Sequence, residues 1–121
     1  METPRIFESE YRFCCILWAH QPVSSAELVR LCAEQLQWKK STTFTVIRRL
    51  AERGVLKNEN ATVTALISRE EVEHARSREL VDTTFGGSLP RFLAAFTGGS
   101  RLTAEEAAAL RRLIDEREEK V

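Results

Sequence analysis

Apolar residues recur at the three- and four-residue spacing of a helix along most of the chain. This spacing predicts helices, because every third or fourth side chain lies on the same helical face. The apolar pair Val55-Leu56 is instead followed by Val63, Ala65 and Ile67 in alternation, which predicts two short strands joined by a polar turn at 58–60. The predicted helices span about 8–20, 25–36, 41–53, 69–85, 89–96 and 103–119.

Start and stop signals support these boundaries. Ser24, Ser68 and Thr103 each begin a Ser/Thr-x-x-Glu pattern, in which a hydroxyl and a carboxylate bond reciprocally to the backbone at a helix start. Gly54 follows the third helix and is expected to end it. The segments 86–88 and 98–100, both Gly-Gly-Ser, are interpreted as corners between helices, because phosphate-binding glycine loops follow strands.

The order of the predicted elements indicates a fold class. Three short helices and then a two-stranded hairpin, within about 60 residues, follow the plan of a winged helix-turn-helix. We therefore expect a mainly α fold, with a winged helix-turn-helix domain at 1–67 and a three-helix tail at 68–121.

The tail has little material for a core of its own. Three amphipathic helices in about 50 residues are short for an independent domain, so their apolar stripes need a partner. We expect a second copy in a twofold homodimer, with packing of the tail on its own N-terminal domain as the alternative. The expected dimerisation residues are Leu89, Phe92, Leu93, Phe96, Leu110, Leu113 and Ile114.

Composition bears on location and on the class of partner. The 121 residues carry 18 basic and 18 acidic side chains, and this zero net charge argues at first sight against nucleic acid. The net charge of zero is, however, the sum of two unlike parts. Residues 1–67 hold nine basic and seven acidic side chains, whereas residues 68–121 hold nine basic and eleven acidic ones. No apolar run approaches the roughly 20 residues of a membrane span, so no membrane insertion is expected. The absence of a secretory signal and three cysteines without CxxC spacing fit a cytoplasmic protein.

Basic residues concentrate around the third predicted helix. Six of them, opposed only by Glu52, lie between Gln37 and Lys57. On the third helix of a helix-turn-helix, such cations and the hydroxyls beside them are expected to bind double-stranded DNA; solvated surface cations are the alternative. The six are Lys39, Lys40, Arg48, Arg49, Arg53 and Lys57. The expected DNA-binding residues are Lys39, Lys40, Ser41, Thr42, Thr45, Arg48 and Arg49.

Aromatic and sulfur-containing side chains each have two interpretations. Trp38 and Phe44 could stack on bases, but packing in the core or at the hinge between helices is expected for both. Cys14 and Cys32 lie on apolar stripes and are expected to be small core residues. Cys15 points away from Cys14, which leaves a thiol or metal sensor as an alternative function.

Motifs of the common enzyme classes are missing. The chain has no HExxH, GxxxxGK[ST] or GxSxG segment and no Ser/His/Asp set. Its cysteines, His20 and His74 lack the spacing of metal ligands. We therefore expect no catalysis, no cofactor and no bound metal.

Several motifs together resemble one family of regulators. The opening pattern comprises Ser9-Glu10-Tyr11, Ile16-Leu17-Trp18 and residues 22–28. The recognition-helix pattern comprises Trp38, Thr42, Thr45, Arg49-Leu50 and Gly54-Val55-Leu56. The tail pattern comprises Ser68-Arg69-Glu70-Glu71 and Phe85-Gly86-Gly87-Ser88-Leu89. In order and spacing, from about Ser9 to Arg112, they resemble the penicillinase-repressor family of bacterial winged-helix regulators, the BlaI/MecI/CopY group.

The resemblance implies a cytosolic homodimeric repressor on a palindromic operator, released by a signal such as a β-lactam or a metal ion. Members relieved by proteolysis, through a membrane sensor-protease, carry an Asn-Phe bond where this chain has Ala95-Phe96. The family's wing carries Gly, Arg and an aromatic residue, where this chain has the uncharged segment 60–63. The Cys-rich ending of copper-responsive members has no counterpart at 118–121.

We therefore expect a sequence-specific transcriptional repressor that controls antibiotic-resistance or metal-homeostasis genes. The alternatives are a protein-interaction adaptor built on the winged helix, and a thiol or metal sensor that uses Cys15. Salt-dependent binding to the chain's own promoter separates the repressor from the adaptor.

Overall fold

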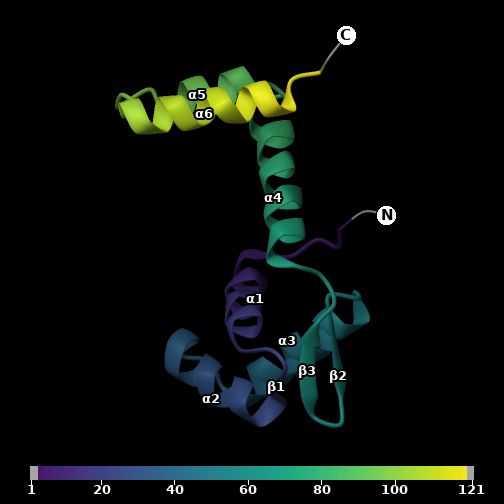
Figure 1. Ribbon diagram of the computed structural model, residues 1–121. Helices are drawn as coiled ribbons and strands as arrows, with labels where there is room; N and C mark the ends of the chain where they lie inside the picture. Colours follow the sequence, from purple (N-terminus) through teal and green to yellow (C-terminus); the bar gives the residue numbers. More distant parts are fainter. Residues whose placement is uncertain (1–2, 120–121) are drawn as a thin grey trace. The chain divides into compact units, whose positions relative to one another are not determined.

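The computed structural model describes residues 3–119 and is mainly α-helical (Figure 1). Its elements are α1 (Glu8–His20), β1 (Val23–Ser24), α2 (Ser25–Leu36), α3 (Lys40–Glu52), β2 (Leu56–Glu59), β3 (Thr62–Ala65), α4 (Arg69–Thr84), α5 (Leu89–Phe96) and α6 (Ala104–Arg117). This order of helices and strands confirms the predicted winged helix. The chain divides into two compact units, residues 1–77 and 78–121.

Side-chain caps mark the starts of α2, α4 and α6. Ser68 Oγ accepts from the N–H of Glu71 at 3.0 Å, and the Glu71 carboxylate accepts from the N–H of Ser68 at 3.2 Å. Thr103 and Glu106 form the same reciprocal pair at the start of α6. At α2, only the hydroxyl half forms: Ser24 accepts from Glu27, whose carboxylate binds Arg30 instead. The predicted capping boxes are thus complete at two helices and partial at the third.

Gly54 ends α3 as the sequence predicts. Its φ of +78° is in the left-handed region, which glycine adopts readily and residues with a Cβ atom do not. The N–H of Gly54 donates to Ala51 at 3.1 Å, and the N–H of Val55 donates to Leu50 at 2.9 Å. These are the two bonds of a Schellman motif. They turn the chain directly from α3 into β2.

The sheet has the strand order β1-β3-β2, and both pairings are antiparallel. The two-residue strand β1 is absent from the prediction. The predicted turn at 58–60 is also wrong, because Asn58 and Glu59 belong to β2 and pair with Val63 and Thr62. The turn lies at Asn60 and Ala61, both with positive φ.

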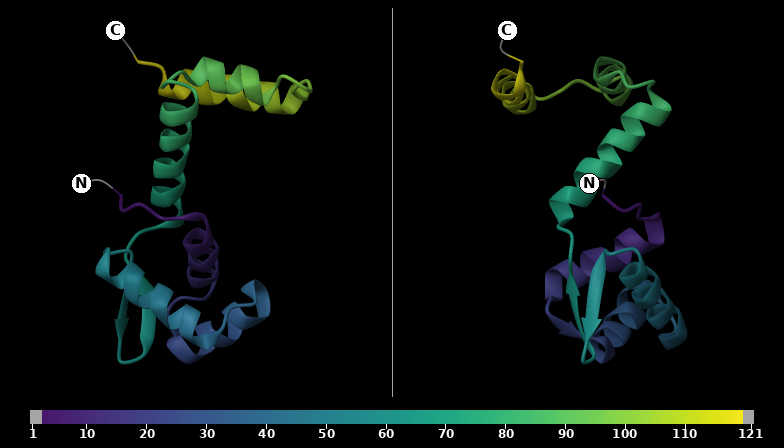
Figure 2. Two further views of the ribbon diagram at one scale, coloured as in Figure 1. Left: turned by 180° about the vertical axis from the view of Figure 1, so that it is seen from behind. Right: turned by 90° about the vertical axis from the view of Figure 1, so that its right-hand side faces the viewer.

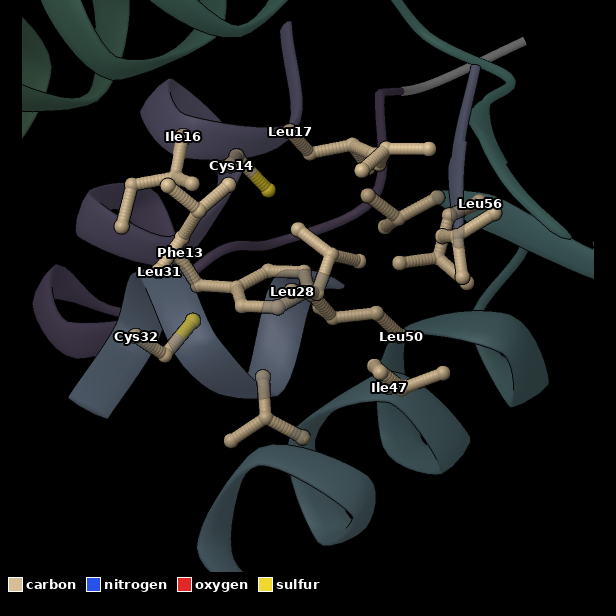
Figure 3. Packing of buried hydrophobic residues seen from close by; sticks show 14 of the residues in the cluster. Phe13, Cys14, Ile16, Leu17, Leu28, Leu31, Cys32, Ile47, Leu50 and Leu56 are labelled. Atoms are coloured by element: carbon tan, nitrogen blue, oxygen red, sulfur yellow. The ribbon is translucent and has the colours of Figure 1, made fainter. Parts of the chain in front are cut away.

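A single hydrophobic core lies beneath α1, α2, α3 and the hairpin (Figure 3). Phe13, Leu17, Leu28 and Leu50 are fully buried in it. The Trp38 ring stacks parallel to Phe13, with 6.1 Å between the ring centroids. This confirms that Trp38 packs at the turn before α3. Helix α3 packs on this core with its apolar face, so its opposite face is exposed.

The second unit consists of the end of α4 together with α5 and α6, whose axes have similar directions but which lie apart in the right-hand view of Figure 2. Gly86 and Gly87 adopt positive φ values after α4, and Ser88 Oγ accepts from the N–H of Arg91 at the start of α5. Gly98 and Gly99 form the next corner without left-handed conformations. The tail therefore bends at both predicted corners.

Helix α4 differs from the prediction of three amphipathic tail helices. Its sequence is largely polar, and Val72, Leu80 and Val81 are its only large apolar residues. Val72 and Val81 are buried, whereas Leu80 is exposed. The apolar stripes of the tail therefore belong to α5 and α6. Across residues 3–119, each helix is too short or too polar to cross a membrane.

Candidate nucleic-acid interface

Helix α3 turns one face inward and leaves the other exposed. Thr43, Val46, Ile47 and Leu50 are buried, as their spacing predicts. Buried Thr43 also donates from its hydroxyl to the Lys39 carbonyl at 3.4 Å. The polar side chains on the opposite face of α3 are therefore free to contact a partner.

The structure places the predicted DNA-binding residues on this exposed side. Lys39 occupies the N-cap position, and Lys40 is the first helical residue. Of the seven, Thr45 is half-buried and the others are exposed: Lys39, Lys40, Ser41, Thr42, Arg48 and Arg49. No side chain caps this helix start, and its first turn has no acidic residue. The positive end of the helix dipole and two ammonium groups thus lie together, an arrangement that favours an anion.

Ion pairing separates the six basic residues of this stretch into two groups. Arg53 pairs with the Glu10 carboxylate, and Lys57 lies 3.8 Å from the carboxylate of Glu59. The other four form no ion pair with any residue in the described range 3–119: Lys39, Lys40, Arg48 and Arg49. Four free cations therefore remain on or beside α3.

The Glu10–Arg53 pair was not anticipated from the sequence. Glu10 is only 6% exposed, and its carboxylate also accepts from the N–H of Phe7 at 2.9 Å. Arg53 donates in addition to the Arg5 carbonyl at 2.8 Å. One available signal was that Glu10 lies three residues before Phe13 on the apolar face of α1, where a carboxylate requires a partner. The pair ties the end of α3 to the start of α1.

The wing formed by β2 and β3 carries no net charge. Its single cation, Lys57, is offset by neighbouring Glu59, and the turn residues Asn60 and Ala61 are exposed. The Ala61 carbonyl accepts from the N–H of Ser25 at 2.8 Å, which anchors the turn to the start of α2. Positive charge is therefore concentrated at α3 rather than at the wing.

Phe44 does not pack as predicted. Its side chain is 38% exposed and lies outside the core cluster. Lys40 Nζ lies over the Phe44 ring, 6.0 Å from the ring centroid. Phe44 therefore belongs to the exposed side of α3. It lies on the flank of the helix, away from the buried face that carries Val46 and Leu50.

Aromatic and charged contacts join α1 to the beginning of α4. Arg76 pairs with Glu8 at 2.5 Å and lies 4.2 Å above the Tyr11 ring. The hydrogen bond from Arg76 lowers the pKa of the Glu8 carboxyl. Trp18 Nε1 donates to the Ile67 carbonyl at 3.0 Å. Within the first unit, these contacts fix the first turns of α4 on the winged helix.

The cysteines lie where the sequence predicts. Cys14 and Cys32 are buried and Cys15 is half-buried, all with free thiols. Burial raises the pKa of the Cys14 thiol to about 12 and also raises the pKa of Cys32. No group of three or more potential metal ligands occurs among residues 3–119.

The predicted dimerisation residues form an apolar surface on α5 and α6. Four of them are exposed: Leu89, Phe96, Leu113 and Ile114. The half-buried members are Phe92, Leu93 and Leu110. A hollow of about 380 Å³ lies between the two helices, lined in part by Phe92, Phe96, Leu102 and Leu110. Apolar side chains gathered on the surface in this way are typical of a site that contacts another protein.

Ala95-Phe96, which stands where proteolysed members of the family have an Asn-Phe bond, lies in the last turn of α5. Both residues are exposed. Proteases cleave extended chain segments, so this turn would have to unwind before the bond could be cut.

Known proteins resemble this chain over nearly its whole length. The model of the penicillinase repressor family matches residues 6–116. The penicillinase repressor of Bacillus licheniformis is 20% identical over 117 residues, covering 93% of this chain and 91% of that protein. An uncharacterised 16.5 kDa protein of Latilactobacillus sakei, named for its position in the ptsI 3′ region, is 28% identical over 93% of this chain and 80% of its own.

Solved structures share the fold of part of this chain. One is the solution structure of the Bacillus licheniformis BlaI monomeric form in complex with the blaP half-operator, with a TM-score of 0.52 and 22% identity. Another is the DNA-binding domain of the repressor BlaI, with a TM-score of 0.51 and 24% identity. Each match covers 59% of this chain and 93% of the other chain. The chain therefore belongs to the penicillinase repressor family of winged-helix DNA-binding repressors.

Proposed function

We propose that this protein is a cytoplasmic transcriptional repressor that binds a palindromic DNA operator as a homodimer. The observation that carries the proposal is the exposed side of α3, where four cations without carboxylate partners accompany three hydroxyl side chains. In a winged helix-turn-helix this is the helix that enters the major groove. The neighbouring half-operator complex of BlaI supports DNA as the class of partner.

Each residue of this surface has a proposed role. Thr42, Thr45 and Arg48 approach base edges, where a guanidinium can bind both acceptors of a guanine. The phosphate contacts are assigned to Lys39, Lys40, Ser41 and Arg49, which surround the start and one side of α3. Phosphate contacts position the helix, whereas base contacts select the sequence.

The tail supplies the second half of the proposal. The apolar surface of α5 and α6 has the character of an interface, and a self-complementary surface on identical chains produces twofold symmetry. A twofold dimer presents two α3 helices to two half-sites, which explains why a palindrome is expected. The seven residues of this surface are Leu89, Phe92, Leu93, Phe96, Leu110, Leu113 and Ile114.

The name of the Bacillus licheniformis relative favours an antibiotic-resistance gene as the target, with a metal-homeostasis gene as the alternative. Release by a membrane sensor-protease would require cleavage at the position of Ala95-Phe96. Since that bond lies within α5, such a partner would act on a locally unwound tail.

The proposal is tested by measuring binding of the full chain to a DNA fragment from its own promoter at two salt concentrations. We expect tight binding at low salt and a steep loss of affinity at high salt, because bound cations displace counterions from phosphate. A random fragment of equal length is the control and should bind more weakly at both concentrations. Absent or salt-insensitive binding would contradict the proposal and favour a protein-interaction adaptor.

A further inference from the structure

Phe44 is the large apolar side chain that α3 leaves exposed. It is 38% exposed and is not among the buried residues of the core cluster. Leu50, Ile47 and Val46 on the same helix are all buried. Part of an apolar ring is thus presented to water on this side of α3, and contact with an apolar group of a partner would be favourable by hydrophobic transfer.

The neighbours of Phe44 belong to the proposed DNA-binding surface. Ser41 lies three residues before it and Arg48 four residues after it, which places all three along one side of the helix. Lys40 lies over the ring at 6.0 Å and restrains it on that side. Phe44 is also in the first half of α3, the part of a recognition helix that contacts base edges.

The major groove displays one apolar group on its base edges, the C5-methyl group of thymine. We infer that Phe44 contacts a thymine methyl in each half-site and makes thymine preferred there over cytosine. This inference rests on the proposed function, and it assigns a specificity residue that charge and hydrogen bonding do not reveal. The phenyl ring gains by leaving water on contact with the methyl group.

The test removes the methyl group without changing base pairing. After footprinting locates the binding site on the chain's own promoter, each thymine is replaced in turn by deoxyuridine, and affinity is measured by fluorescence anisotropy. The wild-type protein should lose about fourfold in affinity at one position of each half-site, the factor that corresponds to burial of about one methyl-sized group. All other replacements should have smaller effects or none.

Variants of the protein then assign that loss to Phe44. Phe44→Ala should bind the thymine operator about fourfold more weakly and should be indifferent to uracil at the same position. Leu66→Ala is the matched control, because Leu66 is 54% exposed and follows β3 in the same unit, outside α3. It should retain both the wild-type affinity and the wild-type response to uracil. Circular dichroism should show the same helix content in all three proteins, since both substituted side chains are exposed.

Two outcomes would overturn the inference while DNA binding stands. In the first, the wild-type protein binds every uracil-containing operator as tightly as the original. In the second, Phe44→Ala retains the wild-type response to uracil. If the wild-type protein binds no DNA at all, the proposed function fails together with the inference, and Phe44 would instead belong to a protein-binding surface.

Discussion

Arg48 and Lys39 carry the same charge, Lys39 at the start of α3 and Arg48 in its second half, yet their proposed roles differ. Arg48→Ala should cost about 1–3 kcal/mol in operator binding and relax the preference at one base position. Lys39→Ala should weaken binding to all sequences alike and reduce the slope of log affinity against log salt by about 1. Affinity measurements on operator and random DNA over a salt series check both. Equal effects of the two variants on both DNAs would contradict the division of roles.

The pair between buried Glu10 and half-buried Arg53 makes a prediction about stability. Glu10→Gln keeps the shape of the side chain but leaves the guanidinium of Arg53 without its counter-charge, so the free energy of unfolding should fall by about 2 kcal/mol. Glu34→Gln is the control, because Glu34 pairs with Arg30 in an exposed position and should change stability by less than about 1 kcal/mol. Urea unfolding measures both. Equal midpoints for the two variants would show that the pair between α1 and α3 contributes no more than a surface pair.

The thiols should differ in reactivity. Because burial raises the pKa of Cys14 to about 12, its reactive thiolate is a very small fraction at pH 8 and becomes a large fraction only as the pH approaches 12. Half-buried Cys15 should therefore react first with a maleimide in the native protein, and Cys14 and Cys32 only after denaturation. Mass spectrometry of the labelled peptides distinguishes them. Rapid labelling of Cys14 in the native state would contradict its burial.

Single residues were predictable where local periodicity decides their environment. The spacing of Thr43, Val46, Ile47 and Leu50 is enough to place Arg48 on the exposed side of α3. The ion pair of Arg53 was not predictable in the same way, because its partner lies 43 residues away. Phe44 lies outside the buried core because it is on the flank of α3, where the helical period does not decide whether a side chain is buried.

At the level of elements, Gly54 makes a prediction that concerns the backbone alone. A Cβ atom at Gly54 would meet no neighbour within 4 Å, but its φ of +78° is strained for alanine. Gly54→Ala should therefore lower the free energy of unfolding by about 1 kcal/mol. Gly99→Ala is the control, because Gly99 has equally open space and no positive φ. Thermal unfolding followed by circular dichroism compares them, and equal stability of both variants would show that the turn after α3 tolerates a side chain.

Most element boundaries followed from caps and periodicity. The predicted spans 8–20, 25–36 and 89–96 agree with α1, α2 and α5, because each helix begins or ends at a local signal. The strand β1 could not be recognised, since two residues carry no alternation and its pairing with β3 spans about 40 positions of the chain. The hairpin turn was misplaced because Ala61 adopts a positive φ that its residue type does not suggest.

For the whole molecule, we expect a homodimer formed through the apolar residues of α5 and α6. Ile114 is 57% exposed on the apolar surface of α6, and Ile114→Glu would place a charge in the proposed interface. We expect a monomer by light scattering and a loss of operator affinity of roughly tenfold or more, because two linked half-sites are no longer bound together. Ala108→Glu adds the same charge elsewhere on α6, at an exposed position outside the apolar set, and should remain dimeric. A dimeric Ile114→Glu variant would show that this surface is not the interface.

The domain organisation was predictable only in outline. A change from basic to acidic balance and a run of capped helices indicated a separate tail beyond residue 67. The compact units divide at residues 77 and 78, within the single helix α4, so the boundary at 67 stays a prediction. A polar helix such as α4 offers little periodicity from which a boundary could be located.

The uncovered apolar surface of α5 and α6 has a consequence for gene dosage. If only pairs hold the operator, as proposed, then below the dissociation constant of the pair their number follows the square of the protein concentration. Halving synthesis would leave about one quarter of the pairs. A modest fall in expression would thus produce a sharp rise in transcription of the target, and the hydrophobicity of Phe96, Leu113 and Ile114 would set the protein level at which this threshold lies.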